Sequence, residues 1–128
     1  MHMKWFLYVL LSAICILLPA QTDVKTIDPS AFQTKIKSLK NEQLIDVRTP
    51  EEFASGHLQN AVNINFYSGD FKEQLEKLDK SKPVMVYCKS GGRSGKAMAI
   101  LKELGFAVVY NLDGGIEGWK EKKLPIVN

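Results

Sequence analysis

The sequence predicts a single α/β domain with a mainly parallel central sheet and helices on both faces. Strand-like apolar runs alternate with amphipathic helical segments from Val24 onward, and the connections between them are short. One run, "PVMVYC" at 83–88, is almost continuously apolar, as expected of a strand covered on both faces. The length of 128 residues suits one domain, and neither an internal repeat nor a linker divides it.

The first helix is expected at 28–39. Asp28 is a typical N-cap and Pro29 suits the first helical position. Three apolar residues then recur on one helical face: Phe32, Ile36 and Leu39. A short strand run, "QLIDV" at 43–47, follows this helix.

A second helix, expected at 49–56, opens with a capping box. Thr49 is the cap, a proline follows it, and Glu52 stands three residues after the cap. Gly56 ends this helix. The run "AVNIN" at 61–65 is the next strand candidate.

The second half continues the alternation. The segment "DFKEQLEKL" carries a helical stripe of three apolar residues: Phe71, Leu75 and Leu78. The remaining expected elements are a helix at 70–78, the strand at 83–88, a helix at 94–105 closed by a glycine, a strand at 107–112, and a short helix with a tail at 115–125.

The N-terminal segment 1–20 has the layout of a secretory signal peptide. "MHMK" is a cationic start, and an apolar run of 14 residues extends from Trp5 to Leu18. Spanning a bilayer takes about 20 residues, so a membrane anchor is the less favoured alternative. Lipidation of Cys15 is disfavoured by the bulky residue before it. We expect cleavage after Ala20, a mature domain at 21–128, and an exported, periplasmic or extracellular protein.

Composition excludes several classes of function. The formal charge of +3 is modest and the basic residues are scattered, which gives no support for nucleic-acid binding. No histidine or cysteine cluster has metal-ligand spacing, and no phosphate or dinucleotide motif occurs. We therefore expect no metal or cofactor. We also expect a monomer.

Cys88 is the single cysteine that remains if the signal peptide is removed. It cannot then form an internal disulfide, which leaves an intermolecular bond, a free functional thiol, or a buried cysteine acting as a small hydrophobe. It ends the most apolar strand, and ligands of parallel α/β sheets bind beyond the carboxyl ends of the strands. Its position makes Cys88 a candidate site residue.

The segment "CKSGGRS" at 88–94 predicts an anion cradle around the cysteine sulfur. It leads into a helix whose first N–H groups have no partner within the helix and whose positive end favours an anion. Gly91 and Gly92 allow backbone conformations closed to other residues, so successive N–H groups can turn inward. Lys89 and Arg93 add positive charge. The thiol pKa should lie below its ordinary value of about 8.5, which favours the nucleophilic thiolate. A simple glycine turn and a solvated arginine are the alternatives.

Three segments, in order, resemble the rhodanese family of sulfurtransferases, in particular its small, exported, single-domain members. They are "LIDVRTPEEFASGHLQNAVNIN", "VMVYCKSGGRS" with its following helix, and "NLDGGIEGW". The resemblance extends over roughly 24–125. It implies a rhodanese-like fold and a thiosulfate sulfurtransferase, in which the cysteine takes sulfur from an anionic donor as a persulfide. Cyanide or a thiol then accepts that sulfur.

The resemblance also implies roles for individual residues. Cys88 is the catalytic residue. The expected donor-binding loop consists of Lys89, Ser90, Gly91, Gly92, Arg93 and Ser94, with Ser94 opening the helix. Arg48 would assist with anionic donors and Asp46 would order the loops near the site, although a structural ion pair is the alternative for both. Apart from the resemblance, Phe66 and Tyr67 are candidates for the site entrance.

Further residues near the motifs are expected to be structural. His57 could act as a general base beside a reactive cysteine, but the resemblance places it in a structural turn. Asn60 stands where the family often has glycine, which asparagine tolerates if φ is positive. Gly114 and Gly115 are expected to form a tight turn facing the site, with Trp119 packed beneath it.

Two other functions stay open. A cysteine phosphatase or arsenate reductase is the less favoured one: cysteine phosphatases have a similar loop with one more residue between the cysteine and the arginine, so the shorter loop here suits a single sulfur atom better than a phosphate. A rhodanese-like module that carries sulfur or binds a partner, with little turnover, is the other alternative. A dithiol oxidoreductase is excluded because no second cysteine lies near Cys88.

Overall fold

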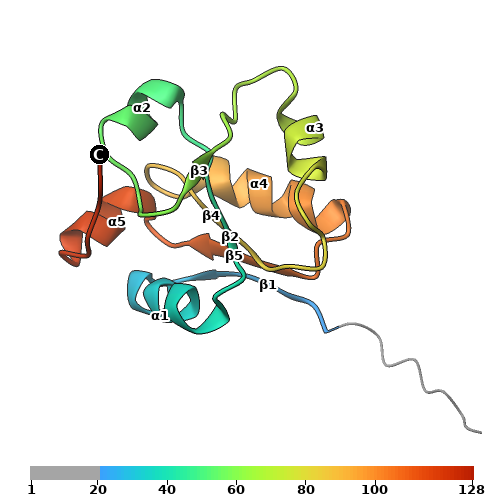
Figure 1. Ribbon diagram of the computed structural model, residues 1–128, viewed down its shortest axis with the longest axis horizontal. Coiled ribbons are helices and arrows are strands. Elements are labelled where there is room, and N and C mark those ends of the chain that lie inside the picture. Colours follow the sequence, from blue (N-terminus) through green and yellow to red (C-terminus); the bar gives the residue numbers. More distant parts are fainter. Residues whose placement is uncertain (1–20) are drawn as a thin grey trace, which may run out of the picture.

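The computed structural model describes residues 21–128 and confirms the predicted fold class. Five parallel strands form one sheet in the order β1-β5-β4-β2-β3, with helices on both faces (Figure 1). The expected signal peptide, 1–20, lies outside the described residues, so its cleavage and the export of the protein stay predictions. Within 21–128, none of the helices has the length and apolar character needed to span a bilayer.

The elements, in chain order, are β1 (Asp23–Ile27), α1 (Pro29–Leu39), β2 (Gln43–Asp46), α2 (Pro50–Ala54), β3 (Val62–Asn63), α3 (Phe71–Glu76), β4 (Val84–Tyr87), α4 (Gly92–Glu103), β5 (Val108–Leu112) and α5 (Gly115–Glu121).

The two edge strands are where the sequence prediction was weakest. No strand was assigned before the first helix, yet Asp23–Ile27 forms β1 and pairs with β5. Two of its residues, Lys25 and Thr26, are exposed, so β1 lacks the continuous apolar run that marks a central strand. The expected strand at 61–65 is reduced to Val62–Asn63 at the opposite edge.

The predicted helix caps are present. The Asp28 carboxylate accepts a hydrogen bond from the Ala31 N–H at 2.8 Å. In α2 the capping box is complete, because the Thr49 hydroxyl accepts from the Glu52 N–H and the Glu52 carboxylate accepts from the Thr49 N–H, both at 3.3 Å. These caps satisfy N–H groups that a helix start otherwise leaves without partners.

The core lies in two layers because successive side chains of a strand point to opposite faces of the sheet. Val84 and Val86 of β4 pack with residues of α3 and α4 on one face, while Met85 and Tyr87 pack with residues of α1 and α5 on the other. In Figure 1, α1 lies on the opposite side of the sheet from α3 and α4. All four residues of β4 are fully buried. This central strand therefore places Cys88 at the carboxyl end of the sheet, directly after a well-packed segment.

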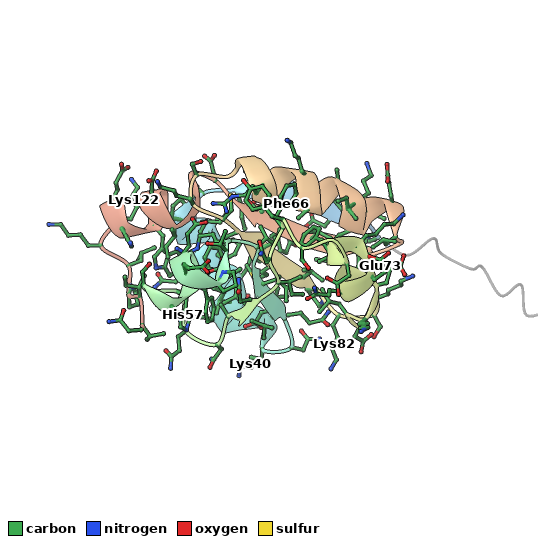
Figure 2. All side chains as sticks on the ribbon, turned by 90° about the horizontal axis from the view of Figure 1, so that it is seen from above. Lys40, His57, Phe66, Glu73, Lys82 and Lys122 are labelled. Atoms are coloured by element: carbon green, nitrogen blue, oxygen red, sulfur yellow. The ribbon has the colours of Figure 1, made fainter. Side chains whose placement is uncertain are left out.

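The residues expected to be structural have structural contacts. The Trp119 ring meets Phe32 edge-on with centroids 6.3 Å apart, and its Nε1–H donates to the Pro125 carbonyl at 2.9 Å. His57, labelled in Figure 2, stacks on Phe53 with centroids 3.8 Å apart, and its backbone pairs with Val127 in an antiparallel bridge. Asn60 has a positive φ of 68°. This agrees with its place at a position where the family often has glycine.

Candidate active site

Cys88 lies directly after β4, at the floor of a loop that leads into α4. The residue is only 1% exposed. Its Sγ nevertheless has donors around it, since the Gly91 N–H donates at 3.1 Å and the Ser94 hydroxyl donates at 3.3 Å. The sulfur is thus buried among hydrogen-bond donors, which distinguishes it from a cysteine packed as a hydrophobe.

Two opposing effects set the acidity of the Cys88 thiol. Burial is the largest and raises the pKa, because a charged sulfur loses its hydration. Hydrogen bonds from the Ser94 hydroxyl and from the N–H groups of Ser94, Gly91 and Ser90 favour the thiolate, and together they outweigh burial. The pKa of Cys88 is therefore lowered, as the sequence predicted, by donors that stabilise the anion.

The two loop glycines differ, which corrects the expectation that both need special backbone conformations. Gly91 has a φ of 110° and caps α4, in the region that favours glycine. Gly92 is the first residue of α4 and is not among the positive-φ glycines. The helix therefore begins at Gly92, and Ser94 is fully buried in its first turn instead of opening it.

Arg93 reaches across the site to α2. Its two terminal nitrogens donate to the two carboxylate oxygens of Glu52 at 2.8 and 3.0 Å. Its guanidinium also lies over the Tyr67 ring, 5.6 Å from the centroid, in a cation–π arrangement. The hydrogen bond from Arg93 is the main reason that the pKa of Glu52 falls to about 2.

Asp46 and Arg48 form a buried ion pair. The Arg48 Nε donates to both Asp46 carboxylate oxygens at 3.0 and 3.1 Å, and its Nη2 donates to Asp46 at 2.7 Å and to the Gly56 carbonyl at 2.6 Å. Both residues are nearly inaccessible, at 0% and 3% exposure. These contacts tie the end of β2 to the end of α2 and form the structural ion pair that the sequence left as the alternative for both residues. The suggestion that Arg48 assists an anionic donor stays a prediction.

The remaining loop residues border solvent. Lys89 and Ser90 are exposed, and Lys89 Nζ lies 3.7 Å from the Glu117 carboxylate in a solvent-exposed ion pair. A hollow of about 260 Å³ lies next to this loop. It is lined by Arg48, Glu52, Ser55, Lys89, Ile116, Glu117 and Lys120.

The aromatic pair expected near the entrance divides between core and surface. Phe66, labelled in Figure 2, packs against Phe71 and the core layer beneath α3 and α4. Tyr67 is 67% exposed and contacts Arg93. Tyr67 is therefore the residue of this pair that lies at the surface beside Arg93.

Sequence reasoning missed two contributors to the site. Glu52 was recognised only as part of a capping box, because nothing local indicates that it pairs with a residue 41 positions away. The first N–H groups of α5 were also missed, although those of Ile116 and Glu117 donate to the carbonyls of Cys88 and Lys89. The adjacent Gly114 and Gly115 were the sequence signal that this turn comes close to another part of the backbone.

The fold and the site define a single-domain α/β protein whose central strand ends in a thiolate-stabilising loop. The family model of the rhodanese-like domain matches residues 28–122. The chain therefore belongs to the rhodanese-like domain family.

Curated relatives include named sulfurtransferases. The chain is 34% identical over 104 residues to a sulfurtransferase of Allochromatium vinosum, covering 81% of this chain and 95% of that protein. It is 39% identical over 103 residues to the putative sulfurtransferase YtwF of Bacillus subtilis, covering 80% and 97%. It is 35% identical over 100 residues to the thiosulfate sulfurtransferase GlpE of Vibrio cholerae, covering 78% and 92%.

Solved structures agree with the family. A rhodanese-related protein of Thermoplasma volcanium superposes with a TM-score of 0.71 at 30% identity, covering 80% of this chain and 97% of that one. A rhodanese-like domain protein of Staphylococcus aureus superposes with a TM-score of 0.68 at 30% identity, covering 81% and 99%. Relatives of this kind support a sulfurtransferase of rhodanese type.

Proposed function

We propose that the protein is a thiosulfate-type sulfurtransferase that works through a persulfide on Cys88. It would take sulfane sulfur from an anionic donor and pass it to a thiol or to cyanide. The observation that supports this most is the Cys88 Sγ, which accepts hydrogen bonds from the Gly91 N–H and the Ser94 hydroxyl that favour its anionic form. The sulfurtransferases among the relatives support the same class of reaction.

The reaction balances without a cofactor. The Cys88 thiolate attacks the outer sulfur of thiosulfate, the sulfur–sulfur bond of the donor breaks, and sulfite leaves with the bonding electron pair. The enzyme then carries a Cys88 persulfide anion. A thiolate or cyanide attacks the terminal sulfur, takes it as a persulfide or thiocyanate, and restores the thiolate.

The loop suits this chemistry because every enzyme state in the cycle carries a negative charge on a sulfur atom within or next to the loop. N–H groups fixed by the backbone stabilise the thiolate and can follow the charge to the added sulfur atom without reorganising. The Arg93 charge is largely balanced by Glu52, so the cradle itself, more than a free cation, supplies the stabilisation. This arrangement also fits one sulfur atom better than a phosphate.

The proposal is tested by intact mass and turnover in a Cys15→Ser protein, in which Cys88 is the remaining cysteine. Incubation with thiosulfate should add the mass of one sulfur atom, and cyanide should remove it with formation of thiocyanate. Cys88→Ser in the same background should abolish both while leaving the circular dichroism spectrum unchanged. Retained transfer in Cys88→Ser would refute the mechanism. Stable loading without turnover would instead indicate a sulfur carrier, and hydrolysis of an aryl phosphate would indicate a phosphatase.

A further inference from the structure

The turn before α5 lies in direct contact with the backbone of the cysteine loop. Gly115 has a φ of 59°. A Cβ at this position would lie 2.6 Å from the Cys88 carbonyl oxygen, and still closer to the Lys89 carbonyl group. These partners are backbone atoms, which cannot rotate away as a flexible side chain can. No side chain fits at this position unless the loop moves.

The absence of a side chain brings two N–H groups of α5 against the loop. The Ile116 N–H donates to the Cys88 carbonyl at 2.9 Å, and the Glu117 N–H donates to the Lys89 carbonyl at 3.1 Å. These carbonyls are therefore held toward α5.

Holding the carbonyls also orients the N–H groups of the same peptide units. The C=O and N–H of a trans peptide point in opposite directions, and the peptide between Lys89 and Ser90 is trans. With its carbonyl fixed toward Glu117, this unit presents the Ser90 N–H on the side away from α5. That N–H is one of the groups whose hydrogen bonds lower the pKa of Cys88.

We propose that Gly115 is a positioning residue for the anion cradle: by leaving room for the α5 N–H groups to hold the Cys88 and Lys89 carbonyls, it keeps the loop N–H groups directed at the sulfur. Stabilisation of the Cys88 thiolate by these N–H groups does not depend on which reaction the protein catalyses. Stabilisation of a Cys88 persulfide rests on the proposed function. Gly115 thus acts on Sγ through the loop and contacts no substrate.

Gly114 provides a matched control in the same turn. Its φ of 72° is as unfavourable for alanine as that of Gly115, but a Cβ there would lie 3.5 Å from the Gly118 Cα, in ordinary van der Waals contact within α5. Alanine at either position therefore strains the backbone similarly. Only alanine at Gly115 displaces the cysteine loop.

The test compares Gly115→Ala with Gly114→Ala in the Cys15→Ser background. The thiol pKa is read from the rate of alkylation by iodoacetamide as a function of pH, and folding is followed by circular dichroism and thermal melting. Gly115→Ala should raise the thiol pKa by about one unit, the size expected for a weakened hydrogen bond to a charged group. Release of sulfite in a single turnover should slow by a similar factor, about tenfold. Gly114→Ala should keep the parent thiol pKa.

Equal thiol pKa values in the two folded alanine variants would overturn the proposal. If Gly115→Ala does not fold, the test passes to a protein in which the amide of Glu117 is replaced by an ester, which removes the N–H and adds no atoms near the loop. A raised thiol pKa in this protein supports the proposal, and an unchanged pKa overturns it. A third result is that the parent protein shows no sulfur loading while the thiol pKa is raised in Gly115→Ala and unchanged in Gly114→Ala. That result would refute the proposed function and leave the positioning role of Gly115 intact.

Discussion

At the scale of single residues, the reactivity of Cys88 depends on a balance between burial and hydrogen bonding. A buried thiol with no donors would keep its proton, since desolvation disfavours the charged form. Here the Gly91 N–H and the Ser94 hydroxyl lie within hydrogen-bonding distance of Sγ, and the balance favours the anion. This part of the site was largely predictable, because Cys88 comes directly before a helix start, where the first N–H groups have no partner within the helix, and the glycines between them let N–H groups turn inward.

The unequal roles of the loop glycines lead to a prediction at this scale. Gly91→Ala should destabilise the fold by about 1–2 kcal/mol, the usual cost of a left-handed conformation for a residue with a Cβ. Gly92→Ala should be neutral or slightly stabilising, because a Cβ there meets nothing within 4 Å and alanine is the better helix former. Urea unfolding of both variants checks this. Equal destabilisation of the two would contradict the assignment of the strained position to Gly91.

At the scale of elements, α2 links the folding of the domain to the site. Glu52 closes the capping box of α2 and also accepts both hydrogen bonds from Arg93 of α4. The first role follows from spacing in the sequence, whereas the second depends on β2 and β4 being neighbours in the sheet. Strand order is a property of the whole fold, so the sequence showed the cap and not the ion pair.

The Glu52 ion pair predicts a pH dependence of stability. The folded pKa of about 2 lies below the ordinary 4.5, so the pair contributes stability above pH 4.5 that is lost as the pH falls toward 2. At neutral pH, Glu52→Gln should cost about 1 kcal/mol, since the pair is only partly buried. The matched control is Glu51→Gln, which removes a neighbouring exposed carboxylate of the same helix turn.

Urea unfolding between neutral pH and the lowest pH at which the protein still folds measures both variants. The difference in the free energy of unfolding between Glu52→Gln and the parent protein should shrink as the solution is acidified. The corresponding difference for Glu51→Gln should stay small at every pH. If Glu52→Gln lowers the free energy of unfolding by the same amount in acid as at neutral pH, the charge of Glu52 is not what stabilises the fold.

At the scale of the whole molecule, the site results from two properties of a parallel sheet. The central strand is buried on both faces, which gives a strong sequence signal, and its carboxyl end is open to a loop and a helix start. The edge strands β1 and β3 carry weaker signals because part of each faces solvent. Contacts between segments far apart in the chain, such as the α5 N–H groups on the Cys88 loop, follow from packing that local patterns do not specify.

The thiol pKa of Cys88 decides whether the loop stabilises a thiolate. It is obtained from the thiolate absorbance of the folded Cys15→Ser protein as the pH is varied, with the same protein in urea as the reference. We expect a lower pKa in the folded protein than in the unfolded chain. A folded pKa equal to or above the unfolded value would show that burial prevails over the hydrogen bonds, and the cradle would not stabilise an anion.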